Sequence, residues 1–343
     1  MGKAMPANLS PEYKTAEAAY KRARDPRERL ELLRTMLRVV PKHKGTDHLQ
    51  ADIKSRIKEL TEELAGPKKG GARSGPPTTF RPEGAAQIAL LGPPNSGKST
   101  LHHLLTGSHA QIGEYPFTTQ HAQPGMMQYD DVAYQLIDLP PISAEHPIPW
   151  ISNALQPADG CLLVVDLCEA GCVERAIAVR DILAERKIVL SARWPTDEGP
   201  APQDVEGDPF TLHLPTLLVV NKIDAVDDPE QEITVFEDLT EMHFPTLSVS
   251  ATTGAGLERL GAWLFDKLGV VRVYTKTPGK PADMERPYTI RRGGTVHQVA
   301  DLIHHDLAES LKFARVWRPG IYDGQHVGAD HDLADGDVLE VHT

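Results

Sequence analysis

The sequence predicts an α/β fold with a mainly parallel sheet, preceded by helices and followed by a small β-rich module. From residue 87 onward, short apolar runs alternate with stretches of helical character, the pattern of strands joined by crossover helices. A glycine-rich segment, residues 92–99, joins the first apolar run to the first of these helices. Upstream, apolar residues recur at helical spacing. We therefore expect separate helical, α/β and β-rich parts.

Residues 1–65 are predicted to be helical, with a basic turn. Apolar residues follow helical spacing in the second half of this part, at Leu49, Ile53, Ile57, Leu60 and Leu64. Residues 41–45, Pro-Lys-His-Lys-Gly, interrupt the pattern and predict a turn between two antiparallel helices. Residues 66–84 are predicted to be a basic linker, flexible by its Gly and Pro content. The α/β domain is then expected over 85–275 and the β-rich module over 284–343.

The charge is distributed unevenly along the chain. The whole chain has a formal net charge of −12, which argues against a protein that coats nucleic acid over its entire surface. Residues 1–75 nevertheless carry 17 Lys and Arg against 10 Asp and Glu. This asymmetry suggests a basic recognition element on an acidic body. Without a signal segment or a membrane-length apolar run, we expect a cytoplasmic location.

Cysteines and histidines give no metal-binding pattern. The three cysteines have no metal-ligand spacing, and their odd number suits a reducing compartment. The pairs His102-His103 and His304-His305 lack zinc spacing, so we expect them on the solvated surface.

The elements of the α/β domain follow from its apolar runs. We expect strands at 87–91, 126–129, 134–137, 161–165, 217–220 and 246–249, with helices at 98–106, 171–185 and 256–268. Asp130 and Asp131 separate two of these strands closely enough to predict an antiparallel hairpin at the sheet edge. Residues 194–211 are expected to be a polar insertion, either a plain loop or hairpin or a partner contact.

Residues 92–99, Gly-Pro-Pro-Asn-Ser-Gly-Lys-Ser, predict a phosphate-binding loop. The glycines let several backbone N–H groups face the phosphates, and the following helix adds its N-terminal dipole. Lys98 is expected to reach the β- and γ-phosphates, and the Ser99 hydroxyl to bind Mg²⁺. The alternative is a plain glycine-rich turn. The candidate nucleotide contacts in this segment are Gly92, Pro93, Asn95, Ser96, Gly97, Lys98, Ser99 and Thr100.

A second motif, residues 221–224, Asn-Lys-Ile-Asp, predicts selection of guanine. Asp224 can accept hydrogen bonds from guanine N1–H and N2–H₂, a donor pair that adenine lacks. Asn221 is expected to brace the loop and the Lys222 stem to cover the base. Ser250, Ala251 and Thr252 follow a later strand, where the Ala251 N–H could donate to guanine O6. A weaker alternative is an ATP-specific enzyme with the same phosphate loop.

These motifs resemble a known family. Residues 92–99, 115–119 (Tyr-Pro-Phe-Thr-Thr) and 221–224 occur in the order found in the developmentally regulated GTP-binding proteins, a branch of the Obg-type GTPases. The basic turn at 41–45 is similar to that of the branch's N-terminal helices. Residues 286–343 resemble a TGS domain, through Phe-Ala-Arg-Val-Trp, Asp-Gly-Gln-His and Asp-Gly-Asp-Val motifs that begin at Phe313, Asp323 and Asp335.

The resemblance implies a P-loop GTPase domain with an N-terminal helical hairpin and a C-terminal, ubiquitin-like β-grasp (TGS) domain. Lys98 would act in catalysis, and Thr118 or Thr119 would complete the Mg²⁺ coordination when GTP is bound. Asp138 would hold Mg²⁺ through a water. Asn95 matches a residue that helps bind K⁺, although loop stabilisation by its amide is an equal alternative. The implied partners are GTP and GDP, together with the ribosome or RNA.

One segment departs from the family pattern. Where the family has Asp-x-Pro-Gly, residues 138–141 read Asp-Leu-Pro-Pro, and Pro141 has no N–H to donate to the γ-phosphate. We therefore expect GTP binding and slow hydrolysis. The alternative is a nucleotide-stabilised ribosome- or RNA-binding module with little or no hydrolysis.

Overall fold

The computed structural model describes residues 9–23, 25–42, 46–65, 80–107, 121–197, 210–318 and 323–343. The chain divides into two compact units. One unit comprises residues 1–77 and 199–212, and the other comprises residues 78–198 and 213–343. No helix among the described residues is both long enough and apolar enough to cross a membrane.

Among the residues that the structure describes, the first unit contains three helices: α1 (Pro11–Arg22), α2 (Pro26–Val39) and α3 (Asp47–Ala65). Ser10 and Asp25 cap α1 and α2 through side-chain oxygens that accept backbone N–H groups, and a proline stands in the first turn of each helix. The expected hairpin corresponds to α2 and α3, whereas the sequence pattern did not resolve α1 as a third helix. Of the basic turn, residues 43–45 lie outside the described residues, as do residues 66–79 of the linker.

Phe210 completes the core of this helical unit. Its ring is 6% exposed and packs edge-on against Tyr20, with the Arg56 guanidinium 4.4 Å from the ring centroid. Phe210 stands two residues before the strand that leads to the guanine motif. Phe210, near the end of the expected polar insertion, is therefore a buried residue that anchors this segment in the helical core, and it is not part of a surface loop.

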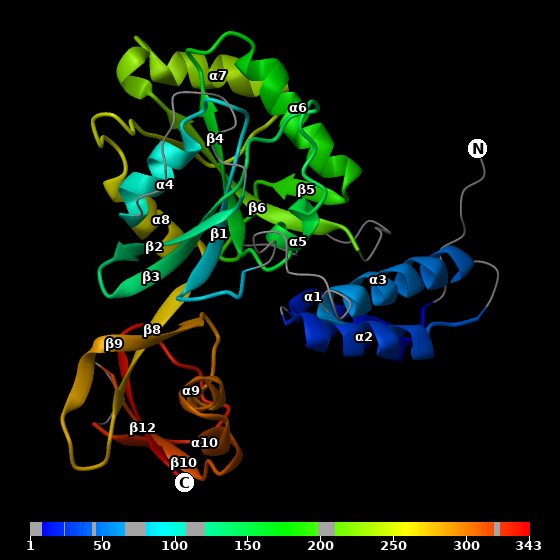
Figure 1. Ribbon diagram of the computed structural model, residues 1–343. Coiled ribbons are helices and arrows are strands. Elements are labelled where there is room, and N and C mark those ends of the chain that lie inside the picture. The colour runs from blue at the N-terminus through cyan, green and yellow to red at the C-terminus, as the bar shows by residue number, and fades with distance from the viewer. Residues whose placement is uncertain are drawn as a thin grey trace, which may run out of the picture. The chain divides into compact units, whose positions relative to one another are not determined.

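The second unit begins with a seven-stranded sheet in the order β2-β3-β1-β4-β6-β5, in which β7 also pairs with β6 (Figure 1). Its strands are β1 (Ala86–Leu91), β2 (Gln123–Tyr129), β3 (Val132–Asp138), β4 (Gly160–Asp166), β5 (Ile188–Ser191), β6 (Leu212–Asn221) and β7 (Thr246–Ser248). The pairs β1–β3, β1–β4, β4–β6 and β6–β7 are parallel. The antiparallel hairpin of β2 and β3 at the sheet edge is confirmed.

Helices cover both faces of this sheet. They are α4 (Lys98–Thr106), α5 (Ile151–Leu155), α6 (Cys172–Glu185), α7 (Pro229–Thr240) and α8 (Glu258–Lys267), and a 3₁₀ turn, η2 (Ile223–Ala225), follows β6. Figure 1 shows α4 and α8 on one face and α5 and α6 on the other. This burial on two sides explains why every residue of β1 and β4 is buried and why both strands are mainly apolar in sequence.

The start of the expected insertion belongs to the core. Trp194 is 1% exposed, its indole N–H donates to the Thr216 carbonyl oxygen at 3.2 Å, and its ring packs edge-on against Trp263. Its assignment to a polar insertion was therefore wrong, because a single tryptophan among polar residues gives no periodic signal. Residues 198–209 lie outside the described residues.

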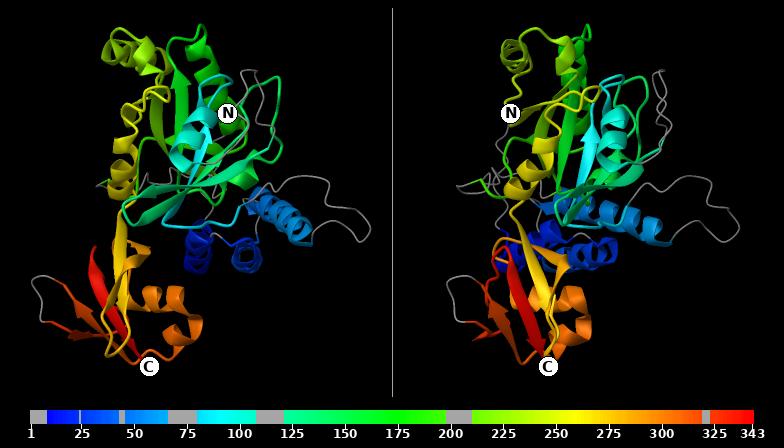
Figure 2. Two further views of the ribbon diagram at one scale, coloured as in Figure 1. Left: turned by 60° about the vertical axis from the view of Figure 1, so that its left-hand side comes forward. Right: turned by 90° about the vertical axis from the view of Figure 1, so that its left-hand side faces the viewer.

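The C-terminal sheet has the order β11-β10-β12-β8-β9, with α9 and α10 on one side (Figure 2). Its elements are β8 (Val270–Lys276), β9 (Ala282–Arg291), α9 (Val296–Ile303), α10 (His305–Glu309), β10 (Phe313–Trp317), β11 (Gln325–Val327) and β12 (Asp337–His342). The sheet therefore starts at β8, ahead of the boundaries expected at 275 and 284. Parallel pairing of β8 with β12 draws it into this module.

Candidate functional site

The loop between β1 and α4 has a backbone that only glycine tolerates at two positions. Gly97 has φ +87°, and a Cβ there would lie 2.2 Å from the Asn221 amide nitrogen. A Cβ on Gly92 would lie 2.3 Å from the Val164 carbonyl oxygen. Asn95 also adopts a positive φ, +62°. The loop is therefore wound tightly at the N-terminus of α4, as an anion-binding loop requires.

Lys98 is buried inside this loop. Its side chain donates to the Pro93 carbonyl oxygen at 2.8 Å, and the residue is 4% exposed. Burial lowers the pKa of Lys98 to about 8, an effect that the nearby negative charge of Asp138 partly opposes. A cation held within a curled loop in this way has few compensating charges and favours an anionic ligand.

Ser99 and Asp138 meet although they are 39 positions apart in the sequence. The Ser99 hydroxyl donates to Asp138 Oδ2 at 2.7 Å, and Asp138 is fully buried at the end of β3. Ser99 lies in the first turn of α4, with Thr100 next to it. A hydroxyl and a carboxylate suit Mg²⁺, which prefers oxygen ligands and keeps several waters. Thr118 and Thr119 lie outside the described residues.

The segment after Asp138 is buried against the phosphate loop. Pro140 and Pro141 are both buried, and Ile142 is 3% exposed. The Ile142 N–H donates to the Gly92 carbonyl oxygen at 3.2 Å. Pro141, which has no N–H to donate, thus lies in a loop that is held in place by contacts with the rest of the protein.

Asn221 joins the three predicted stretches of the site. Its amide nitrogen donates to the Ser96 carbonyl oxygen at 3.1 Å, and its amide oxygen accepts the Ala251 N–H at 3.0 Å. The residue is 1% exposed. Asn221 therefore ties the phosphate loop to the segment after β7. The Ala251 N–H, expected to be available for guanine O6, is bonded to Asn221 in the structure.

Lys222 and Asp224 lie beside this bridge. Lys222 has φ +62°, and its ammonium donates to the Asn95 carbonyl oxygen at 3.2 Å. Asp224 is exposed, and its Oδ1 accepts a hydrogen bond of 2.5 Å from the Ser250 hydroxyl. Thr252 is exposed on the same loop. The Asp224 carboxylate is thus oriented by Ser250 while remaining open to a ligand.

Two buried polar residues near the site were missed or misplaced by the sequence analysis. Asp166, at the end of β4, is 6% exposed and binds the Lys222 ammonium at 2.6 Å. The feature of the sequence that could have indicated Asp166 is a carboxylate at the end of an apolar strand. His102 is 1% exposed rather than solvated, and it bonds to the Leu136 carbonyl oxygen at 3.3 Å. Burial lowers the pKa of His102. No group of three or more His, Cys, Asp or Glu in the described ranges could hold a metal ion.

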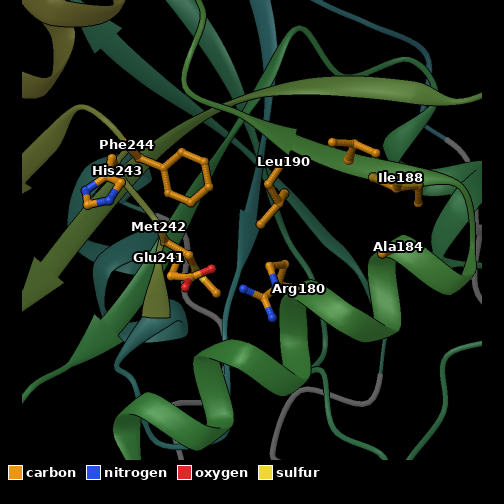
Figure 3. Close-up of a pocket in the computed structure, with 9 residues that line it drawn as sticks. Arg180, Ala184, Ile188, Leu190, Glu241, Met242, His243 and Phe244 are labelled. Carbon is orange, nitrogen blue, oxygen red and sulfur yellow. The ribbon is translucent and has the colours of Figure 1, made fainter. Parts of the chain in front are cut away.

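A separate hollow of about 280 Å³ lies away from these residues (Figure 3). It is lined by Arg180 and Ala184 of α6, residues 188–190 of β5 and residues 241–244. None of the predicted site residues contributes to it. Its lining is mainly apolar side chain, with Arg180 pointing into the space in Figure 3.

Comparisons with known proteins agree with this architecture. Residues 87–193 match the family of 50S ribosome-binding GTPases, and residues 271–343 match the TGS domain. A GTP-binding protein of Methanocaldococcus jannaschii is 28% identical over 92% of both chains. The developmentally regulated G-protein 2 of Arabidopsis thaliana is 26% identical over 92% of this chain and 90% of its own length.

Two further relatives extend the comparison. Developmentally regulated GTP-binding protein 1 of Xenopus laevis is 28% identical over 88% of this chain and 94% of its own. The solved structure of the Schizosaccharomyces pombe YchF GTPase has the same fold, with a TM-score of 0.50 and 13% identity over 77% of this chain and 99% of that one. The chain is therefore similar, over about nine tenths of its length, to developmentally regulated GTP-binding proteins, and it has a GTPase domain followed by a TGS domain.

Proposed function

We propose that this protein binds GTP with Mg²⁺ and hydrolyses it slowly to GDP and phosphate. The observation that carries the proposal is the double hydrogen bond of Asn221 to Ser96 and Ala251, because it unites the phosphate loop with the guanine-reading segments. A buried bridge of this kind fixes the distance between the sites for the base and for the phosphates. The parts of the site are then preorganised for a guanine nucleotide.

Each residue at the phosphate end has a role in this proposal. Lys98 binds the β- and γ-phosphate oxygens, exchanging its bond to Pro93 for charged acceptors. Ser99 and Asp138 would hold Mg²⁺, and Thr118 or Thr119 would complete its set of oxygen ligands. When bound, Mg²⁺ neutralises charge on the phosphates.

Two further contacts of the phosphate loop belong to the proposal. Asn95 is the candidate contact for K⁺. The backbone N–H groups of residues 92–100 cradle the phosphate oxygens, because the loop curls at the N-terminus of α4. Removal of single contacts should therefore weaken the binding of GTP and the binding of GDP to different extents, since GDP lacks the γ-phosphate.

The base is selected at the other end of the site. Asp224 accepts the two donors of the guanine edge, and Ser250 orients its carboxylate. Lys222 covers the base with its stem. The Ala251 N–H reaches guanine O6 only by sharing or exchanging its bond to Asn221. Adenine would leave Asp224 facing an acceptor, which disfavours ATP.

A second candidate function is a binding module that nucleotide stabilises without productive hydrolysis. The buried Pro140-Pro141 segment and the bond from Ile142 to Gly92 favour it, because this loop is held by protein contacts and lacks an N–H at Pro141 for the γ-phosphate. In either case we propose action on the ribosome or RNA in the cytoplasm. The proposed contacts with the ribosome or RNA are the basic residues of the N-terminal part and the TGS domain, as expected from the sequence.

Base selection is tested by binding of fluorescent GDP and ADP analogues to the wild type and to Asp224→Asn. We expect GDP to bind at least a hundredfold more tightly than ADP in the wild type, and this preference to fall in the variant, because an amide cannot accept both guanine donors. Equal binding of the two nucleotides by the wild type would refute the guanine assignment.

Hydrolysis is tested by single-turnover assays with GTP and Mg²⁺ in K⁺ and in Na⁺. A rate above that of buffer supports the GTPase, and faster hydrolysis in K⁺ supports the role of Asn95. Tight GTP binding with no turnover in either salt leaves the binding module as the function.

A further inference from the structure

Asp166 occupies a position beside the guanine motif that no part of the proposed chemistry uses. It is the last residue of β4, and in the parallel pairing of β4 with β6 it stands opposite Asn221. Parallel strands end at the same edge of a sheet, where ligands of α/β folds bind. Asp166 is therefore placed by the fold next to the base-binding loop.

Both oxygens of the Asp166 carboxylate are engaged. Oδ1 accepts the backbone N–H of Cys168 at 3.0 Å, and Oδ2 accepts the Lys222 ammonium at 2.6 Å. The side chain of Asp166 is 6% exposed, whereas that of Lys222 is 41% exposed. A carboxylate buried to this degree is stable only when paired, so its preference for the ammonium is strong.

Lys222 depends on this pairing for a defined conformation. Its backbone is in the left-handed region, and its ammonium spans from Asp166 to the Asn95 carbonyl oxygen of the phosphate loop. A half-exposed lysine would otherwise sample many rotamers. The two acceptors fix the end of the side chain, and with it the path of the aliphatic stem.

We infer that Asp166 is a positioning residue for guanine binding, which holds Lys222 in the conformation whose stem covers the base. The inference rests on the proposed guanine site. Asp166 acts through the charge of Lys222 and makes no contact with the nucleotide. The ligand class is a guanine nucleotide of either phosphate number, because Asp166 lies at the end of the site that binds the base.

The test is a double-mutant cycle on the Kd of a fluorescent GDP analogue. Asp166→Asn keeps the size of the side chain and an acceptor for the Cys168 N–H but removes the charge. Lys222→Met keeps an apolar stem without the ammonium. We expect each single variant to raise Kd about tenfold, the effect of one charge-assisted hydrogen bond, and the double variant to bind as Lys222→Met does. Additive effects, or an unchanged Kd in Asp166→Asn, would overturn the inference.

Two further measurements separate positioning from general stability. Asp228→Ala is the control, since the Asp228 side chain caps α7 by accepting the Gln231 N–H, and its loss should lower the melting temperature but leave Kd unchanged. Acetylation of Lys222 in nucleotide-free protein, followed by mass spectrometry, should be several times faster in Asp166→Asn than in the wild type.

The acetylation experiment also separates the inference from the proposed function. It reads the pairing of Asp166 with Lys222 without any nucleotide. Faster acetylation in the variant together with no binding of GDP by the wild type would refute the proposed function and the role in binding, and leave the ion pair as a structural bond only. GDP binding by the wild type with equal acetylation rates would refute the inference alone.

Discussion

The backbone N–H of Ile142 donates to the carbonyl oxygen of Gly92 at 3.2 Å, so the segment after Asp138 is attached to the phosphate loop. The two prolines between Asp138 and Ile142 are buried, and proline restricts the backbone on both sides of itself. This attachment links the residue proposed to hold Mg²⁺ to the loop proposed to hold phosphate. It also limits how far the segment can move.

Replacing Pro141 by glycine should restore a γ-phosphate response. The variant gains an N–H and a more flexible backbone, and we expect single-turnover GTP hydrolysis to rise about tenfold, a modest effect for one added donor. The free energy of unfolding should fall by about 1 kcal/mol through the greater freedom of the unfolded chain. Pro149→Gly, at an exposed position, is the control and should leave hydrolysis unchanged. An unaltered rate in Pro141→Gly would show that the missing N–H does not limit hydrolysis.

Asn221→Ala should weaken both the fold and nucleotide binding. The change leaves the Ser96 carbonyl and the Ala251 N–H without their present partner, so we expect the free energy of unfolding to fall by about 2–4 kcal/mol. GDP affinity should fall about a hundredfold, because the two halves of the site lose their link. Urea denaturation and titration with fluorescent GDP measure these effects. Asn153→Ala, on the exposed side of α5, should change neither the free energy of unfolding nor the GDP affinity. Equal values of both quantities in the two variants would show that the Asn221 hydrogen bonds do not support the site.

Arg272 should make stability depend on pH. Its guanidinium binds Asp131 at 3.1 Å and Asp335 at 2.7 Å, and the Tyr274 hydroxyl also donates to Asp131. Burial opposes ionisation of both carboxylates, but the hydrogen bonds from Tyr274 and Arg272 to Asp131, and from Arg272 to Asp335, leave the pKa of each below its ordinary value of 3.8. Since the folded pKa values lie below the unfolded ones, the stabilisation is complete above about pH 5 and is lost as the pH falls through the folded values.

The corresponding variant is Arg272→Leu. We expect it to lower the free energy of unfolding by about 1–3 kcal/mol at pH 7 and to reduce the further loss of stability between pH 5 and pH 3. Urea denaturation at these pH values tests both effects. Arg286→Leu, at an exposed position in β9, should keep the acid dependence of the wild type. If Arg272→Leu loses as much stability between pH 5 and pH 3 as the wild type does, the acid dependence comes from other carboxylates.

Phe210→Ala should destabilise the helical unit selectively. Truncation of a buried phenylalanine costs about 3–5 kcal/mol, here through lost packing against Tyr20 and Arg56. Hydrogen exchange in α2 and α3 should become faster, while GDP binding should keep its wild-type Kd. Leu239→Ala removes an apolar side chain that is 60% exposed and should change neither property. Unchanged exchange in Phe210→Ala would exclude this residue as an anchor.

Local patterns predicted most of the α/β domain. Its buried parallel strands read as apolar runs, and all six expected strands and three expected helices are confirmed within a few residues. The hairpin at Asp130-Asp131 followed from the short spacing of two strands. The four-residue strand β5 was not predicted, because it lies at the sheet edge with Val189 exposed and gives little apolar signal.

The burial of residues whose partners are distant in the sequence could not be predicted from local patterns. Trp194 and Phe210 stand among polar residues, and only their partners Trp263 and Tyr20 show that they are core. His102 was expected at the surface, since a pair of histidines on a helix does not reveal which one faces a sheet. The membership of β8 in the C-terminal sheet depends on its pairing with β12, which lies more than sixty residues away.

The sequence by itself determined the chemistry available to this protein. It placed Lys98 and Ser99 in a glycine-rich loop and Asp224 after a strand, because these motifs are continuous in the chain. Only the tertiary structure decided how the motifs act on one another. Asn221 joins the phosphate loop to the segment after β7 because parallel pairing brings together the ends of β1, β4, β6 and β7. Asp166 holds Lys222 because the ends of β4 and β6 are aligned, and sequence spacing does not record these alignments.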